Sequence, residues 1–147
     1  FCRIMWSNLV NKDCVFCRIV EGDIPAVKIY ETQDILAFFD AFPAAKGHCL
    51  VIPKGHYESI DFVPDNIISS IFTLAKKIIC LQKKIFNIND VNLLQNNGRE
   101  AGQTVFHMHL HIIPRFKNDN VNLSWKENAY ENDNEILTIA NKMKEGL

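Results

Sequence analysis

Histidines recur at every second position, 107, 109 and 111, between apolar residues of one stretch of the chain, residues 104–115 (TVFHMHLHIIPR). Alternation with a period of two, in a run of β-branched and aromatic residues, predicts a β-strand. Successive side chains of a strand point to opposite faces, so His107, His109 and His111 would share one face. The opposite face, which would pack on the core, would carry Met108, Leu110 and Ile112.

A longer pattern marks residues 65–86, where apolar residues recur three or four positions apart with lysines between them. This spacing predicts a long amphipathic helix with one buried face. A short terminal helix is predicted at 135–144. The order of the elements indicates an α+β fold. Shorter apolar runs between turn residues predict four further strands, at 28–31, 35–40, 48–53 and 91–95.

Charge and hydropathy argue against two classes of partner, nucleic acids and membranes. The chain has 147 residues, with 16 basic and 17 acidic side chains and a formal net charge of −1. This length suits one domain, and the balanced charge gives no field for nucleic acid. No apolar run approaches the ~20 residues of a membrane span, and the N-terminal residues lack a secretory signal pattern. We therefore expect a cytoplasmic protein that binds neither nucleic acids nor membranes.

The five cysteines are odd in number and contain one close pair, which argues against a secreted disulfide framework. That pair, Cys14 and Cys17, has the spacing of half a tetrahedral zinc site. Two small residues in a turn, or free thiols in a reducing cytosol, are the alternatives, and a redox motif would need a βαβ context that does not follow. Cys49 and Cys80 lie in apolar contexts typical of core residues.

All five histidines fall in or beside two predicted strands, because His48 and His56 bracket the strand at 48–53. Imidazole titrates near neutrality and serves as nucleophile, proton carrier or metal ligand. The loop at 96–103 leads into the histidine row, and its Gly98 and Gly102 would let backbone N–H groups approach a ligand. A satisfied polar row on a solvent-facing strand is the alternative.

The run 107–113 (HMHLHII), preceded by 102–105 (GQTV) and matched upstream by 47–54 (GHCLVIPK), resembles the histidine triad (HIT) family of nucleotide hydrolases and transferases. The resemblance implies an antiparallel five-stranded sheet with a long helix and a shorter helix packed on it. It also implies a homodimer whose sheets join. On this basis we expect an N-terminal extension at 1–12, a HIT domain at 13–116, and a C-terminal loop with a short helix at 117–147.

Carried over by position, the resemblance makes His109 the nucleophile that attacks the α-phosphorus of a purine nucleotide. Water would then hydrolyse the nucleotidyl-histidine. His48 would support His109, His111 would bond a phosphate oxygen, and Thr104 would line the leaving-group side. Asp40 also has an alternative role as a turn residue that bonds its own backbone. The residues implied in nucleotide binding are Asp40, Asn96, Gln103, Phe16, Ile24 and Phe39.

The pair Cys14 and Cys17 resembles the zinc-binding, Hint-like branch of the family. In that branch the remaining ligands are the histidine of Pro-Lys-x-His, here His56, and the first histidine of the triad, here His107. Four protein ligands close the coordination shell, so the implied zinc is structural.

The resemblance thus implies a nucleotide phosphohydrolase that releases AMP or GMP from a phosphoramidate or a similar conjugate. Diadenosine polyphosphate hydrolysis is one alternative, because residues 100–104 (EAGQT) and 111–115 (HIIPR) also resemble that branch. A nucleotide-binding adaptor with vestigial catalysis is another, although the triad is intact. A zinc hydrolase would need an open metal position, which four ligands do not leave.

Overall fold

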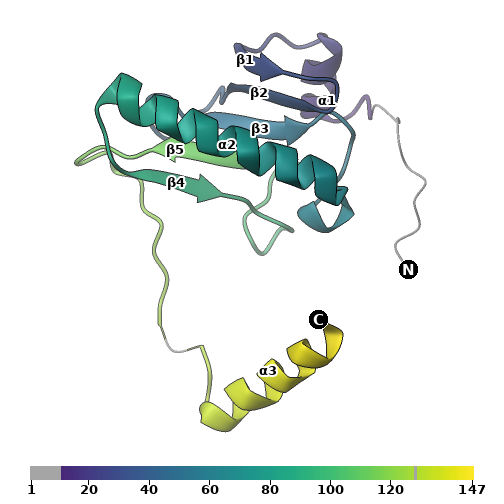
Figure 1. Ribbon diagram of the computed structural model, residues 1–147, viewed down its shortest axis with the longest axis vertical. Coiled ribbons are helices and arrows are strands. Elements are labelled where there is room, and N and C mark those ends of the chain that lie inside the picture. The colour runs from purple at the N-terminus through teal and green to yellow at the C-terminus, as the bar shows by residue number, and fades with distance from the viewer. Residues whose placement is uncertain (1–10, 128) are drawn as a thin grey trace.

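A computed structural model describes residues 11–127 and 129–147, so the expected extension falls mostly outside it. Its described part holds one antiparallel five-stranded sheet in the order β1-β2-β3-β5-β4 (Figure 1). The strands are β1 (Lys28–Glu31), β2 (Ile35–Phe39), β3 (Cys49–Pro53), β4 (Val91–Leu94) and β5 (Leu110–Pro114). The helices are α1 (Val15–Glu21), α2 (Asp65–Phe86) and α3 (Asp133–Gly146), with a 3-10 turn η1 (Ile60–Phe62). The α+β fold is confirmed.

The long helix α2 covers one face of the sheet. Its apolar stripe, with Ile71 and Ala75 fully buried, packs against strand residues that include Val51, Leu110 and Ile112. The sequence pattern predicted both ends of α2 correctly, because the stripe continues over the whole helix. Within the described residues, no helix is both long and apolar enough to cross a membrane.

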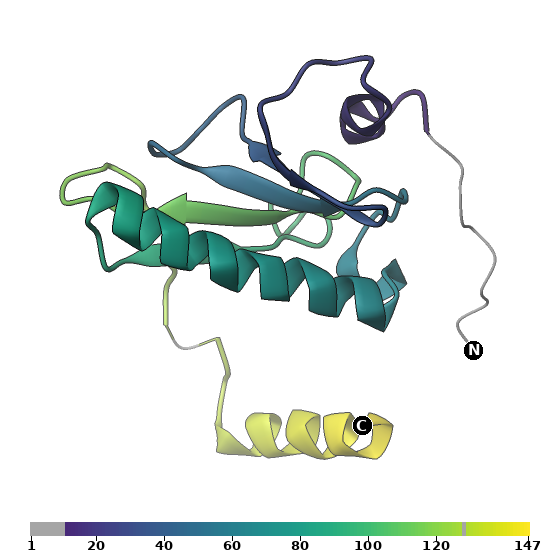
Figure 2. The ribbon, with the colours of Figure 1, turned by 45° about the horizontal axis from the view of Figure 1, so that its top comes forward.

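The short helix α1 covers the opposite face of the sheet (Figure 2). Its Phe16 and Ile19 pack against Leu36, Leu50 and the neighbouring strand residues. The family resemblance implied a shorter helix on the sheet, but the residue pattern did not locate it, since seven residues carry too little periodicity to reveal it. Its start is set by an unusual cap, because the Cys14 sulfur accepts from the backbone N–H of Cys17.

The histidine strand is shorter than the predicted range of 104–115, and this prediction was wrong at its start. Strand β5 begins only at Leu110, so His107 and His109 lie on the extended segment before it. The β3–β5 ladder ends where Val51 pairs with Leu110, and β3 itself ends at Pro53, which has no N–H to donate. The Pro53 carbonyl instead accepts from the His107 side chain.

The predicted alternation begins before the strand, at Met108. Met108, Leu110 and Ile112 are all within 1% of complete burial and belong to the core under α2. The three histidines consequently lie on the α1 side of the sheet, where Phe16 meets the rings of His107 and His109 edge-on.

The C-terminal helix α3 was predicted at 135–144 and forms slightly longer, as Asp133–Gly146. The Asn132 side chain caps it by accepting from the Glu135 N–H. The helix stands away from the sheet, beyond the edge strand β4 (Figures 1 and 2). None of its residues is buried.

Candidate functional site

Two clusters of ionisable side chains meet at the segment that leads into β5. Each cluster draws its members from chain segments far apart in the sequence. His109 lies between the clusters. The first cluster is Cys14, Cys17, His56 and His107, and the second is Asp40, His48 and His111.

In the first cluster the donor atoms of all four residues lie within 4.8 Å of one another. The His107 Nδ1 atom is 3.5 Å from the Cys14 sulfur and 3.6 Å from the Cys17 sulfur. The His56 Nδ1 atom is 3.3 Å from the Cys17 sulfur. Donor atoms around a tetrahedral zinc with Zn–S and Zn–N bonds of about 2.3 and 2.0 Å are about 3.5 Å apart. The four residues therefore fit a closed zinc site.

The protonation of His107 supports this fit. Its Nε2 lies 2.8 Å from the Pro53 carbonyl, which can only accept, so Nε2 carries the proton. The lone pair of Nδ1 is then free on the side of the two sulfurs. Burial lowers the pKa of His107 to about 4, which keeps this imidazole neutral, as metal ligation requires.

The two sulfurs of the cluster resist ionisation when no cation is beside them. Burial, together with the neighbouring Cys14 sulfur, raises the pKa of Cys17 to about 11. Two buried thiolates at this separation would repel each other in a medium of low polarity. A divalent cation removes that repulsion and stabilises both thiolates.

The second cluster is a hydrogen-bonded chain of imidazoles. The backbone N–H of Ala44 donates to His48 Nδ1 over 2.9 Å, so the proton of neutral His48 sits on Nε2. That Nε2–H donates to His111 Nδ1, also over 2.9 Å. His111 must then carry its own proton on Nε2. We call this sequence, Ala44 to His48 to His111, the imidazole relay.

Burial keeps the imidazole relay neutral. It lowers the pKa of His48, although the Asp40 carboxylate opposes the shift. Burial also lowers the pKa of His111 to about 4, and the nearby His109 and His48 add to that effect. At neutral pH the relay is therefore a chain of neutral imidazoles joined by hydrogen bonds, and it carries no positive charge.

Asp40 makes the turn contact that the sequence analysis gave as its alternative role, and it also lies beside the relay. Its Oδ1 accepts from the backbone N–H of Phe42 over 2.8 Å, as in a turn at the end of a strand. Its Oδ2 lies 3.4 Å from His48 Nε2 and 3.9 Å from His111 Nδ1. The turn holds the carboxylate against the relay.

His109 has one nitrogen engaged and one available. Its Nδ1 donates to the His107 carbonyl over 2.7 Å, so Nε2 carries the lone pair. Burial lowers the pKa of His109, which keeps that lone pair unprotonated at neutral pH. The His109 and His111 rings are 4.8 Å apart between centroids, and the Phe16 ring lies 5.1 Å from His109 on its other side. This arrangement holds a neutral imidazole in a fixed orientation, with the lone pair on Nε2.

The loop before the histidines is held by Gln103, whose side chain is buried. Its carbonyl accepts from the Gly98 N–H over 2.7 Å, and its amide donates to the Glu58 and Val105 carbonyls. The Gly102 N–H bonds the Arg99 carbonyl. The N–H groups of Gly98 and Gly102 are therefore engaged within the loop itself.

The structure brings only some of the other expected nucleotide contacts to the histidines. Phe16 lies against His109, whereas Thr104 is exposed in the segment before His107. Phe39, at the end of β2, is 44% exposed, and Ile24 packs beside the α1 cluster. The Asn96 carbonyl accepts from Gln95, and its side-chain amide lies near Gly102.

One positioning residue was missed by the sequence analysis. Gln82 lies in the buried stripe of α2, and its amide donates to the Gly47 carbonyl over 3.0 Å. It thereby holds the turn from which His48 enters the relay. A glutamine at an apolar position of the stripe, four residues after Ile78, is the signal that could have identified it.

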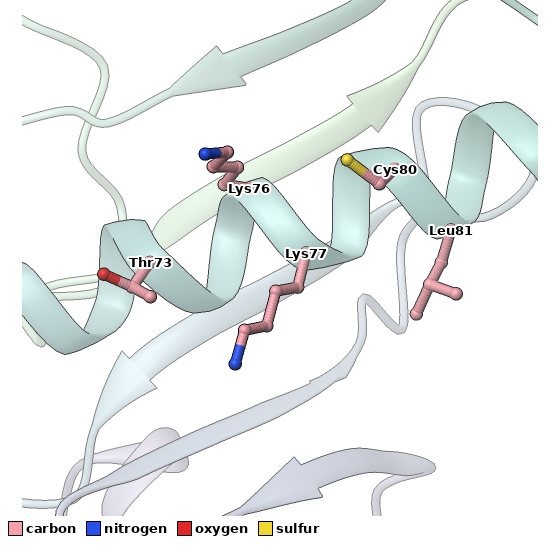
Figure 3. A pocket seen from close by; sticks show the side chains of 5 residues that line it. All are labelled: Thr73, Lys76, Lys77, Cys80 and Leu81. Carbon is pink, nitrogen blue, oxygen red and sulfur yellow. The ribbon is translucent and has the colours of Figure 1, made fainter.

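A shallow hollow of about 460 Å³ lies on the outer side of α2 (Figure 3). It is distant from the histidines, because α2 covers the face of the sheet opposite to them. Its lining residues are Thr73, Lys76, Lys77, Cys80 and Leu81.

Known proteins are similar to this chain in sequence and in fold. The family model described as HIT domain matches residues 21–118. The adenosine 5'-monophosphoramidase of Schizosaccharomyces pombe is 48% identical over 69% of this chain and 74% of its own length. The adenylylsulfatase HINT3 of Arabidopsis thaliana is 39% identical over 77% of this chain and 57% of its own length.

Solved structures are also similar to this chain. The crystal structure of a HIT family protein from Bacillus anthracis matches with a TM-score of 0.85 and 41% identity, over 92% of this chain and 98% of that chain. A zinc-bound histidine triad family protein from Mycobacterium smegmatis matches with a TM-score of 0.70 and 31% identity, over 91% and 97% of the two chains. With the matched histidine segment and the five-stranded sheet, these similarities show that the chain belongs to the HIT domain family.

Proposed function

We propose that the protein hydrolyses purine nucleotide conjugates, foremost nucleoside phosphoramidates, through a nucleotidyl intermediate on His109. The observation that carries the proposal is the free Nε2 lone pair of His109 beside a neutral imidazole relay. We assign this activity to residues 13–116, which contain every group used in the mechanism. The free thiols of the described cysteines suit the reducing cytoplasm in which we place it.

The first step is attack by His109 Nε2 on the α-phosphorus of the nucleotide. A bond forms between Nε2 and phosphorus as the bond from phosphorus to the leaving amine breaks, and the amine takes up a proton. The Nδ1–H bond to the His107 carbonyl orients the ring and stabilises the positive charge that develops on it.

The imidazole relay stabilises the phosphoryl oxygens during attack. His111 carries its proton on Nε2, next to the His109 ring, and that N–H can donate to a phosphoryl oxygen as negative charge builds up. His48 fixes this tautomer by donating to His111 Nδ1. Asp40 lies close enough to favour any positive charge that reaches His48.

Thr104 is the group we propose for the leaving-group side. Its hydroxyl is exposed at the start of the histidine segment and can donate a proton to the departing amine. Gln103 fixes the loop on which Thr104 sits. Water then attacks the nucleotidyl-phosphorus and gives one proton back to the Thr104 oxygen as the bond from Nε2 to phosphorus breaks, which releases the nucleoside monophosphate and restores neutral His109.

We further propose that Cys14, Cys17, His56 and His107 hold one structural zinc ion, as in the Hint-like branch. The support is the donor set, the tetrahedral spacing and the free lone pair of His107 Nδ1. Bound zinc would tie α1 and the segment after β3 to the histidine segment. It would have no catalytic role, since four protein ligands leave no position for water or substrate.

Cleavage of a phosphoanhydride, as in diadenosine polyphosphates, is the second candidate function. The same nucleophile can attack either bond, so the choice depends on the leaving group. The phosphoramidase name of the relative from Schizosaccharomyces pombe favours the first candidate, while the adenylylsulfatase name from Arabidopsis thaliana points to a third leaving group.

Purified protein should therefore be assayed side by side with adenosine phosphoramidate, adenylyl sulfate and diadenosine tetraphosphate, with zinc measured on the same sample. We expect the highest kcat/KM for the phosphoramidate and about one zinc per chain. A preference for diadenosine tetraphosphate would reverse the two candidates. Nucleotide binding without turnover of any substrate would favour an adaptor.

We also propose a homodimer in which the sheets join at β4. β4 is an edge strand whose outer N–H and C=O groups have no neighbouring strand in this sheet, and Leu93 on it is 42% exposed. Sedimentation should give twice the chain mass at micromolar concentration. A monomer at that concentration would contradict this part of the proposal.

A further inference from the structure

Helix α3 carries an apolar stripe that the described part of the chain leaves uncovered. Ile136, Ala140 and Met143 lie three or four positions apart and share one side of the helix. Ile136 is 41% exposed and Met143 is 65% exposed. Among the described residues, no ion pair or side-chain hydrogen bond joins α3 to the sheet or to α2. An isolated amphipathic helix of this length is marginal in water, so α3 requires a covering surface.

The chain carries α3 past the free edge of the sheet. β4 is the edge strand, and α3 lies beyond it (Figure 1). Figure 2 shows α3 on the side of the sheet that α2 covers, with α1 on the other side. A second copy joined at β4 by a two-fold axis would occupy this region. Each α3 would then pass over the helix layer of the partner copy.

Arg115, the residue after β5, fixes the direction in which the chain leaves the sheet. Its guanidinium donates to both carboxylate oxygens of Asp119, over 2.7 and 3.0 Å. It also donates to the Asn92 side chain of β4 and to the Val121 carbonyl, each over 2.7 Å. Arg115 holds the pKa of the Asp119 carboxyl well below its usual range. The tail is thus fastened to β4 where it leaves the domain.

The hollow on α2 has the chemistry to receive α3 (Figure 3). Leu81, which is 54% exposed, gives it an apolar wall. Lys76 and Lys77 also line it, and the first turn of α3 carries Asp133 and Glu135. Opposite charges at these positions would set the direction in which the helix docks.

We propose that α3 of each chain docks across α2 of a second copy, with its apolar stripe in the hollow lined by Thr73, Lys76, Lys77, Cys80 and Leu81. This inference rests on the homodimer proposed above and adds to it an exchanged helix.

The exposed Cys80 gives a direct test by cross-linking. In a Cys2→Ser background, Ala140→Cys places a second accessible thiol on the stripe, and a short bis-maleimide should link it to Cys80. We expect a covalent dimer on a denaturing gel, and its loss when Cys80→Ser is added. Thr138→Cys, on the opposite side of α3, is the matched control and should give at most about a tenth of the dimer.

A second measurement separates the exchanged helix from the dimer itself. Sedimentation of the Ile136→Asp/Met143→Asp chain should give a dimer dissociation constant at least about tenfold above that of the parent. A cross-link that forms within one chain, or an unchanged dissociation constant, would overturn the docking of α3 and leave the dimer standing. A monomeric parent chain would overturn both.

Discussion

The two clusters around His109 use the same side chain for different chemistry, and the comparison shows what decides between the two uses. His107 donates its Nε2 proton to a carbonyl and turns Nδ1 toward two sulfurs. His109, two residues later, donates its Nδ1 proton to a carbonyl and leaves Nε2 free. The choice of nitrogen bonded to the backbone thus separates the proposed metal ligand from the proposed nucleophile.

The clusters also differ in how they are closed. The cysteine cluster is closed by four donors that point at one another. The imidazole relay is a chain with a backbone N–H at one end and, at the other, the His111 ring, whose centroid lies 4.8 Å from that of His109. A closed cluster stabilises the fold, whereas an open chain can respond to a substrate. Changes to the two clusters should therefore affect stability and activity differently.

The largest effect is expected for His109→Ala. Removal of the nucleophile should lower kcat by at least about 10⁴-fold, since covalent chemistry depends on one nitrogen. AMP binding should persist within about tenfold, because binding is spread over the surrounding residues. Steady-state kinetics and calorimetric titration check this prediction. Turnover close to that of the parent would exclude His109 as the nucleophile.

Cys14→Ala should act chiefly on stability. Loss of one ligand should lower the zinc content from about one per chain to a small fraction, and Tm by roughly 10 °C or more. Activity per folded molecule should fall less, because His107 loses a partner but His109 keeps its carbonyl. Calorimetry and metal analysis on one sample measure both. A variant as stable as the parent yet inactive would make the metal catalytic.

Lowering the pH should destabilise the folded protein, because His111 of the imidazole relay takes up a proton more readily in the unfolded chain. Burial lowers the pKa of His111 to about 4, whereas an exposed histidine has a pKa of about 6.5. Between these values the unfolded chain binds a proton that the folded chain does not. The free energy of unfolding should therefore fall as the pH is lowered through this window, by about 2 kcal/mol from this residue.

The comparison with His111→Asn isolates that contribution. The variant keeps the cysteine cluster, so any acid loss of zinc is common to both proteins. Its free energy of unfolding should fall less steeply than that of the parent between about pH 6.5 and 4. Denaturant titrations across this range measure both slopes. Identical slopes would show that His111 is not held neutral by burial.

The smallest effect compares two glycines, one beside each cluster. Gly22 ends α1, which carries Cys17, and Gly47 precedes His48. Both have a positive φ, of 85° and 87°, so alanine costs about 1 kcal/mol at either position. A Cβ at Gly47 would also lie 2.5 Å from the Phe86 ring, whereas one at Gly22 meets nothing within 4 Å.

Gly47→Ala should therefore lower the free energy of unfolding by about 1–2 kcal/mol more than Gly22→Ala. It should also lower kcat, since the displaced turn carries His48. Denaturant unfolding and steady-state kinetics of the two variants provide the test. Equal losses of stability would mean that Phe86 moves aside without cost.

Local patterns predicted much of this fold from the sequence. The stripe of α2 and the alternation from Met108 to Ile112 each depend on burial against one face, and both were recognised. Helix α1 was not located by the residue pattern, because its stability comes from packing on the sheet and from the Cys14 cap. The start of β5 was misplaced because the ladder depends on Pro53, some fifty residues away in the sequence.

The site residues were brought together largely as expected, but their hydrogen bonds could not be predicted. The His48 tautomer depends on the backbone N–H of Ala44, and the His107 tautomer on the Pro53 carbonyl. The position of a backbone N–H or carbonyl group cannot be read from the residue type. Gln103 is an instructive case, because the family resemblance implied ligand contact while its side-chain amide bonds the chain itself.

The most direct test of the mechanism is to trap the intermediate and locate it. The protein is mixed with adenosine phosphoramidate, quenched in denaturant within milliseconds at alkaline pH, and digested. Mass spectrometry of the peptide that spans 107–111 should show one added adenylyl group, with fragmentation placing it on His109. An adduct on His111, or turnover with no adduct at any quench time, would contradict the account.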